Sequence, residues 1–251
     1  MFLLRRGLGL SLRCDSEERV STQIPRPKSK SPDPLPKHTR YFDPKVEAFC
    51  VETFGPEDET LLSIRTDAET EGFPPIAITA MDGQVLSLLV SAANTKRAVE
   101  IGTLGGYSAL WIARAMQPGG MLDCFELEVR RAQFALEHIT RARPAVTVSL
   151  HIGPALDHLN EVLGPVDFVF IDADKENYPH YLEWAARNLR SGGIVAIDNS
   201  FAWGDLLDPA KAPRPEEAEG IRKTVENLSK DKRFRSCMIP TNEGMAVGVR
   251  V

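Results

Sequence analysis

The chain has 251 residues, is 43% hydrophobic and carries a formal net charge of −5, which suits one α/β domain with a full core, or one domain plus a tail. It contains no run of about 18 consecutive apolar residues, so the sequence predicts no membrane-spanning helix. Residues 1–40 hold nine Lys and Arg against four Asp and Glu, whereas residues 41–251 hold 21 against 31. A folded part this acidic is a poor general binder of nucleic acid, because neutralising phosphates requires clustered cations.

Residues 1–40 are expected to form a disordered tail and linker before a folded domain at residues 41–251. The opening "MFLLRRGLGLSLR" has the arginine and leucine content of a mitochondrial presequence, but the acids of "CDSEER" follow at once, and such presequences contain few acids. The four cysteines form no CxxC pair, which indicates reduced thiols in an intracellular protein. We therefore expect a cytoplasmic location, with mitochondrial targeting by the tail as the open alternative.

From residue 41 onward, helical and strand-like patterns alternate. Residues 43–68 are predicted to be helical with a break at "FGPEDE", where Pro56 could occupy a first turn. Further helices are predicted at 79–94, 106–120, 128–143, 155–164, 178–193 and 216–230, and strands at 96–102, 121–127, 145–153, 166–173, 193–199, 234–240 and 244–251. This alternation indicates a parallel sheet covered on both faces. Only "TNEG" separates the last two strands, which predicts an antiparallel hairpin at the edge of the sheet.

A glycine-containing turn, "AVEIGTLGGYS" (98–108), follows the first predicted strand and opens a helix. Its glycines allow the backbone to turn tightly and to approach a ligand closely, although a plain strand–helix turn is an equal alternative. The turn lacks the G-x-G-x-x-G order of a dinucleotide site. Glu100 lies just before it, where a carboxylate would repel a pyrophosphate and attract an ammonium group. These features favour a cationic ligand with an amino-acid end over NAD.

Two further positions resemble parts of a nucleoside site. Glu126 ends the second strand, where a carboxylate can accept hydrogen bonds from both hydroxyls of a ribose, or can simply stabilise the start of the next helix. "HIGPAL" (151–156) places small side chains at the end of the third strand. That segment could leave room for a flat adenine, or it could be an ordinary turn.

Polar side chains end two neighbouring strands, "FIDADK" and "AIDNS". Consecutive strands of a βαβ unit usually lie side by side, so Asp172 and Asp198 should face each other, with Asn199 beside them. Three oxygen donors suit a hard divalent cation such as Mg²⁺, while the alternative role is capping of the following helices. Lys175 would lie near that cation, where positive charge and desolvation favour a general base, although it could also be a surface lysine.

In these motifs the sequence resembles the cation-dependent O-methyltransferases of the caffeoyl-CoA and catechol type. The matching segments are "DGQVLSLL" (82–89), "EIGTLGGYS" (100–108), "FELE", "GPAL" (153–156), "DADKENY" (172–178), "DN" (198–199) and the "EGMAVGVRV" ending. The resemblance covers about residues 41–251. It implies a Rossmann-like class I methyltransferase fold with a seven-stranded, mostly parallel sheet, S-adenosylmethionine as methyl donor, and a homodimer.

The resemblance also implies residue roles. Positions matching the cofactor site are Ile78, Glu100, Gly102, Thr103, Ser108, Glu126, Ala155 and Asp174. Asp172, Asp198 and Asn199 match the metal ligands, and Lys175 together with Asp172 matches the catalytic pair. The chain departs from the family at two points. Ile78 stands where plant members have a threonine, and Trp203 comes one residue later than the corresponding tryptophan.

The leading hypothesis is therefore a Mg²⁺-dependent O-methyltransferase acting on a catechol-like or phenolic small molecule, with no nucleic-acid or membrane partner. A nicotinamide-dependent oxidoreductase on a Rossmann-like fold is the second hypothesis, and Glu100 and the missing glycine order argue against it. A catalytically silent, methyltransferase-like binding protein is the third, and the complete set of polar residues at the strand ends argues against it.

Overall fold

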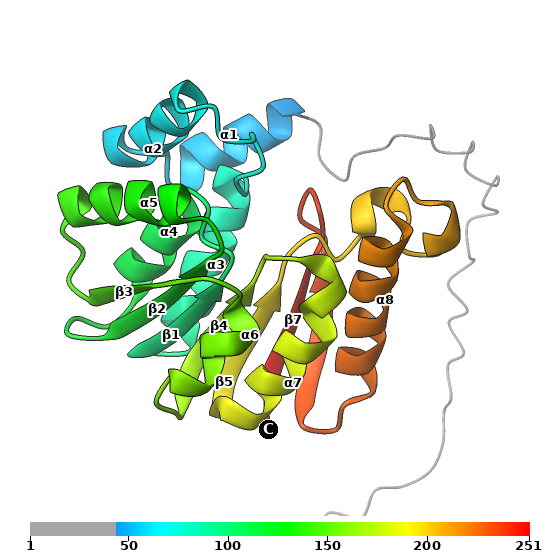
Figure 1. Ribbon diagram of the computed structural model, residues 1–251. Helices are drawn as coiled ribbons and strands as arrows, with labels where there is room; N and C mark the ends of the chain where they lie inside the picture. Colours follow the sequence, from blue (N-terminus) through cyan, green and yellow to red (C-terminus); the bar gives the residue numbers. More distant parts are fainter. Residues whose placement is uncertain (1–43) are drawn as a thin grey trace, which may run out of the picture. The chain divides into compact units, whose positions relative to one another are not determined.

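The computed structural model describes residues 44–251, so the predictions made for residues 1–40 lie outside the described part of the chain. One seven-stranded sheet has the order β3-β2-β1-β4-β5-β7-β6 (Figure 1). The strands are β1 (Arg97–Ile101), β2 (Met121–Glu126), β3 (Thr147–Ile152), β4 (Val166–Ile171), β5 (Leu189–Ile197), β6 (Phe234–Ile239) and β7 (Met245–Arg250).

Strands β1 to β5 pair in parallel, whereas β7 is antiparallel to both β5 and β6. The predicted parallel sheet with an antiparallel hairpin is therefore confirmed. The structure adds that the antiparallel strand lies inside the sheet, since β7 separates β5 from the edge strand β6. The strand order reverses between β1 and β4, and ligands of such sheets bind at this switch point, beyond the carboxyl ends of the strands.

Two layers of helices cover the sheet, as the alternating pattern predicts (Figure 1). Apolar side chains of α2 to α5 form the core on one face, and those of α6 to α8 form the core on the other. The helices are α1 (Pro44–Phe54), α2 (Glu59–Thr70), α3 (Ala80–Ala92), α4 (Tyr107–Ala115), α5 (Val129–Ala142), α6 (Ala155–His158), α7 (Tyr178–Asn188) and α8 (Pro215–Lys230). Short 3₁₀ turns are η1 (Leu159–Glu161), η2 (Lys175–Asn177), η3 (Ala202–Gly204) and η4 (Pro209–Lys211).

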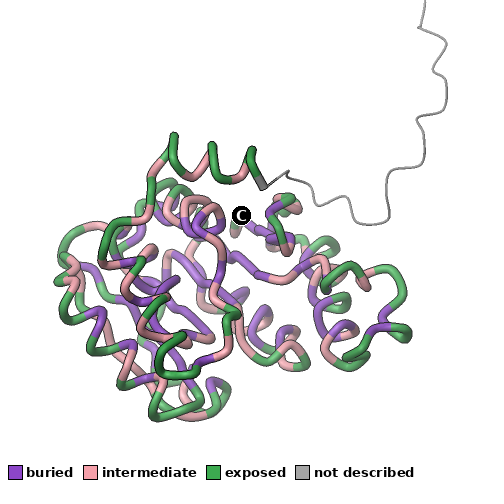
Figure 2. The backbone as a smooth tube through the Cα atoms, turned by 90° about the horizontal axis from the view of Figure 1, so that it is seen from above, coloured by how far each residue is buried: buried purple, intermediate pink, exposed green. Residues whose placement is uncertain are grey.

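Burial follows the layers (Figure 2). The central strands are buried, while α1 is exposed or half-buried along its length. Within residues 44–251, no helix combines the length and the apolar character needed to cross a bilayer. The cysteines of this part, Cys50, Cys124 and Cys237, are unpaired.

Several element predictions were wrong in their boundaries, and the helix predicted at 106–120, for example, ends at Ala115. The helix predicted at 178–193 ends at Asn188, because Leu189 adopts an extended backbone and begins β5 opposite Val166. The helix predicted at 155–164 is reduced to α6 and η1, which end at Glu161 because Val162 adopts an extended backbone. Pro56 precedes α2 rather than entering its first turn, which Asp58 caps by accepting a hydrogen bond from the Leu61 amide at 3.0 Å.

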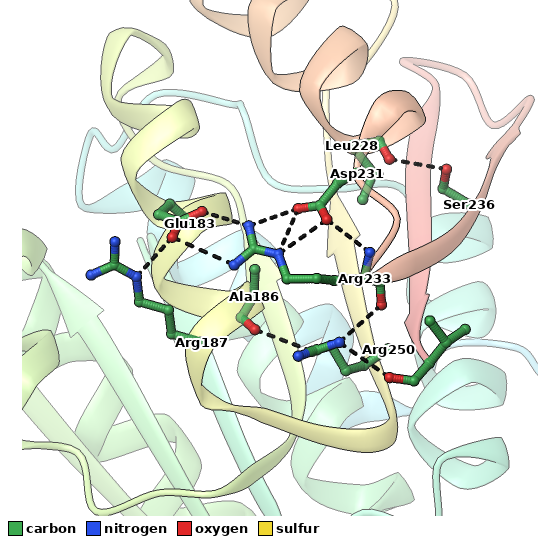
Figure 3. Close-up of polar contacts among 9 residues, drawn as sticks. Glu183, Ala186, Arg187, Leu228, Asp231, Arg233, Ser236 and Arg250 are labelled. Atoms are coloured by element: carbon green, nitrogen blue, oxygen red, sulfur yellow. Dashed lines mark hydrogen bonds and ion pairs between the residues drawn. The ribbon is translucent and has the colours of Figure 1, made fainter.

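A charged cluster ties α7 to the turn between α8 and β6 (Figure 3). The Arg233 guanidinium donates to Asp231 Oδ2 at 2.7 Å and to Glu183 Oε2 at 2.6 Å. Hydrogen bonding to Arg233 holds the pKa values of both carboxyl groups below their usual range. This cluster lies at the amino-terminal end of β6, so it stabilises the fold and takes no part in the cavity described below.

Candidate active site

The ends of β4 and β5 bring the two predicted aspartates to neighbouring positions. Ile171 pairs with Ile197, and the Asp198 amide donates to the Ile171 carbonyl at 3.0 Å, which extends the strand pairing to the next residues. Asp172 and Asp198 therefore follow adjacent strand ends. Burial, and then the negative charge of Asp172, raises the pKa of Asp198 well above its usual value. The two carboxyl groups thus interact across the end of the sheet, as the sequence predicts.

The donor set fits a divalent cation. Asp198 is only 3% exposed, and its Oδ1 is buried without a hydrogen-bond partner in the described structure. A buried carboxylate oxygen without a donor is expensive unless a cation compensates it. Asn199 adopts a left-handed backbone (φ 53°) and lines the cavity with Asp172. No three His, Cys, Asp or Glu side chains of residues 44–251 converge as a metal site, so the predicted set depends on the Asn199 amide as third ligand.

Lys175 lies beside Asp172, on the turn η2 that follows β4. Its Nζ is 2.8 Å from Asp172 Oδ1 and 4.9 Å from the centroid of the Tyr178 ring. The Tyr178 hydroxyl also donates a long hydrogen bond, 3.5 Å, to Asp172 Oδ1, and burial raises the pKa of Tyr178 well above its usual value. An amine and a neutral phenol thus face one carboxylate, and the amine is the basic group nearest the predicted cation ligands.

The turn after β1 approaches β4 very closely. Gly102 has φ +97°, and a Cβ placed there would lie 1.9 Å from the Asp172 carbonyl oxygen. Glycine is therefore required by both the backbone conformation and the space. The close contact places the glycine-containing turn directly against the strand end that carries Asp172.

Glu100 is fully buried beneath this turn. Thr103 Oγ1 donates to its Oε2 at 2.9 Å, whereas its Oε1 has no hydrogen-bond partner in the described structure. Burial raises the pKa of Glu100 to about 7, although the hydroxyls of Ser108 and Thr103 act in the opposite direction. A buried carboxylate of this kind favours a nearby positive charge.

Glu126 is held at the end of β2 by two backbone amides. Its Oε2 accepts from Leu104 N at 2.8 Å, and its Oε1 accepts from Glu128 N at 3.0 Å. Each oxygen keeps a free lone pair that a ribose hydroxyl could use. At the other side of the cavity, Tyr181 donates to Asp174 Oδ1 at 2.6 Å.

These residues surround one cavity of about 880 Å³ at the carboxyl ends of the parallel strands. Its lining includes Ile78, Gly102, Thr103, Ser108, Glu126, Ala155, Asp172, Asp174, Lys175 and Asn199. Glu100 and Asp198, the other two predicted residues, lie buried at its base and do not line it. The structure therefore brings the predicted set together around one cavity large enough for a nucleoside and a second small molecule.

Sequence reasoning missed several cavity walls. The segment Phe73–Ile78 contributes one side of the cavity, and Arg65 and Arg131 line it as well. Near Trp203, the Arg214 guanidinium stacks 4.0 Å from the centre of the indole ring and pairs with Glu217 at 3.0 Å. No periodic pattern marks these side chains, because Phe73–Ile78 and the segment around Trp203 lie outside the α-helices and strands, and the apolar periodicity of α2 and α5 does not identify Arg65 or Arg131. The Arg214–Pro215 pair, just before the helix predicted at 216–230, is the one local signal for the cavity wall at Trp203 and Arg214.

The strand order, the close turn after β1 and the acidic cavity at the switch point together define a class I methyltransferase fold. The sequence model of the O-methyltransferase family matches residues 51–251, and the chain belongs to that family. It is 35% identical to a catechol O-methyltransferase of Mycobacterium tuberculosis over 79% of this chain and 89% of that protein. It is 29% identical to caffeoyl-CoA O-methyltransferase 1 of Arabidopsis thaliana over 78% of this chain and 79% of that protein.

A solved structure agrees with these relatives. The O-methyltransferase from Bacillus cereus in complex with SAH (S-adenosylhomocysteine) has a TM-score of 0.76 and 31% identity, and covers 82% of this chain and 97% of that chain. The family predicted from the motifs is therefore confirmed, as is the fold. The roles of the individual site residues stay predictions.

Proposed function

We propose that this protein moves a methyl group from S-adenosylmethionine to a hydroxyl of a catechol-like or phenolic small molecule, with Mg²⁺ as the divalent cation. The observation that carries the proposal is the set of buried carboxylates at one end of the sheet. Glu100 and Asp198 each keep an oxygen without a partner in the described structure, and Asp172 adds a third charge beside them. Such a set is compensated by protonation or by cationic ligands, and a sulfonium donor and a divalent cation are both cationic.

The cofactor end of the cavity follows from the same residues. Glu126 would accept the ribose hydroxyls, Ala155 leaves space beside the base, and Glu100 favours the ammonium end of the methionine part through the turn at Gly102–Thr103. Ser108, Asp174 and Ile78 complete this end of the cavity. The SAH complex of the Bacillus cereus relative supports this cofactor.

Asp172, Asp198 and Asn199 would hold the cation, which supplies positive charge that lowers the pKa of a bound acceptor hydroxyl. Asp172 Oδ1 also orients Lys175, whose Nζ is the basic atom placed to take the acceptor proton. Trp203, Arg214 and Glu217 form a wall of the same cavity. The flat face of Trp203 suits an aromatic acceptor, and the catechol O-methyltransferase relative supports that class.

The decisive experiment is methyl transfer from S-adenosylmethionine to a panel of catechols and phenols, with and without EDTA. We expect activity that EDTA abolishes and added Mg²⁺ restores. Activity that resists chelation would refute the cation, and full activity in Asp172→Ala would refute the site. Tight binding of S-adenosylmethionine without turnover of any acceptor would favour the catalytically silent alternative. Calorimetry with NADH tests the oxidoreductase alternative, which the family membership does not favour.

A homodimer is also proposed. Phe49 and Phe54 on α1 are 64% and 77% exposed, and Leu88 on α3 is 69% exposed. Large apolar side chains gathered on helices that contact each other are typical of a protein interface. Light scattering should give a dimer for the native chain and a monomer for Phe49→Glu, and a monomeric native chain would contradict the proposal.

A further inference from the structure

A fourth carboxylate, Asp82, lies in the first turn of α3 and is not among the predicted ligands. It is only 2% exposed. Its Oδ2 forms a capping box with Thr79, accepting from Thr79 N at 3.0 Å and from Thr79 Oγ1 at 2.7 Å. Its Oδ1 is buried and has no hydrogen-bond partner in the described structure. One oxygen thus completes the helix cap, and the other is available to a ligand.

Capping alone does not explain this burial. Asp58 also caps a helix, as the N-cap residue of α2 that accepts from the Leu61 amide, but its side chain is 53% exposed and pairs with Arg114 at 2.7 Å. The charge of Asp58 is therefore solvated and neutralised. Asp82 is neither exposed to solvent nor paired with a cation in the described structure. Capping does not account for its buried second oxygen, because a cap needs only one accepting oxygen.

The fold directs Asp82 toward the cation ligands. Side chains alternate along β5, so Asp198 follows Ala196 onto the face that α3 covers. The negative charge of Asp82 is close enough to contribute, after burial and Asp172, to the raised pKa of Asp198. Gly83 allows α3 to pack closely on α4, because a Cβ there would lie 2.5 Å from the Trp111 ring. This close packing fixes the helix turn that carries Asp82.

We propose that Asp82 is a positioning residue of the cation site: its buried negative charge, acting through Asp198, strengthens the binding of a divalent cation. The inference depends on the divalent cation of the proposed function. It assigns Asp82 no contact with the acceptor, since Asp82 does not line the cavity. Outer-shell partners of this kind change metal affinity by about 10- to 100-fold when they are substituted.

The test measures Mg²⁺ binding by calorimetry in the presence of SAH, for the native chain, Asp82→Asn and the matched control Asp58→Asn. Both substitutions keep a side chain that caps a helix and remove one charge. We expect Asp82→Asn to bind Mg²⁺ about 10- to 100-fold more weakly with unchanged affinity for SAH, and Asp58→Asn to bind both like the native chain. Asp82→Gln, a residue that capping boxes accept at this position, replaces Asp82→Asn if the latter does not fold.

The outcomes separate the two proposals. No Mg²⁺ binding by the native chain would refute the cation of the proposed function, and this inference with it. Native Mg²⁺ binding that is unchanged in Asp82→Asn would refute the role of Asp82 alone. An equal loss of SAH and Mg²⁺ affinity would also overturn it, because the substitution would then act through the fold rather than through the cation site.

Discussion

Gly220 is predicted to be essential for the position of Lys175. It lies on α8, about one turn after Glu217, and the backbone of η2 packs directly on it. A Cβ at Gly220 would lie 2.3 Å from the Lys175 carbonyl oxygen and 3.0 Å from Glu176 Cα. These are backbone atoms, so the turn that carries Lys175 must move if the helix gains a side chain.

The size of the movement sets the expected effect of Gly220→Ala. Ordinary contacts begin at 3.4 Å, so the Lys175 carbonyl must withdraw by about 1 Å, and a misplacement of about 1 Å can cost about 100-fold in rate. Overpacking costs about 1–3 kcal/mol in stability, offset by up to about 1 kcal/mol because alanine favours a helix over glycine. We therefore expect a large fall in kcat with a small fall in Tm.

Steady-state kinetics at saturating S-adenosylmethionine and Mg²⁺ measure this effect, with Gly248→Ala as the matched control. A Cβ at Gly248 on β7 would crowd Leu228 Cδ1 at 2.8 Å, which is a side-chain end on the same helix far from Lys175. We expect the control to lower Tm with kcat unchanged. If both variants lose kcat equally, or if Gly220→Ala loses only stability, the reasoning is wrong.

Three further predictions concern stability and cofactor binding. The raised pKa of Glu100 means that the native state holds a proton that the unfolded state has released. Ligand-free stability should therefore fall by about 3 kcal/mol as pH rises from about 4.5 to about 7. Calorimetry should show a weaker dependence of stability on pH in Glu100→Gln, and an equally steep dependence would contradict the assignment. Gly102→Ala should lose at least about 2 kcal/mol of stability together with SAH binding, and a native-like thermal shift with SAH would disprove the close-contact argument. Arg233 lowers the pKa values of Asp231 and Glu183, so its contribution to stability is present above their unfolded pKa values and is lost on acidification. Arg233→Gln should therefore lower Tm at pH 7 more than at pH 3. Equal losses of Tm at the two pH values would show that the charges do not matter.

The strands and the polar residues at the ends of β4 and β5 could be predicted because their signals are local. Apolar runs that stop abruptly at Asp172 and Asp198 mark both a buried strand and its end, and consecutive βαβ strands are usually neighbours. The glycine cluster after β1 reports a backbone conformation directly. These features need no knowledge of distant contacts, and the structure places them as expected.

Other features depend on contacts that no local pattern records. The helix predicted to continue to residue 193 stops at Asn188, because Leu189 finds a pairing partner in Val166 across the sheet. Asp82 has the sequence pattern of an ordinary helix cap, and only the packing of α3 against β5 shows that it is buried near Asp198. Gly220 likewise has no signal within its own helix, since the atoms that exclude a side chain belong to η2.

Helix α8 serves two parts of the cavity at once. Its first turn carries the Arg214–Glu217 pair beside Trp203, and its next turn supports the backbone of Lys175. Shifting this helix to admit a bulkier acceptor would therefore displace the Lys175 amine, the proposed base, as well. Variants with a new acceptor range should be sought upstream of Pro215, in residues 201–214, where side chains can be exchanged while the helix keeps its register.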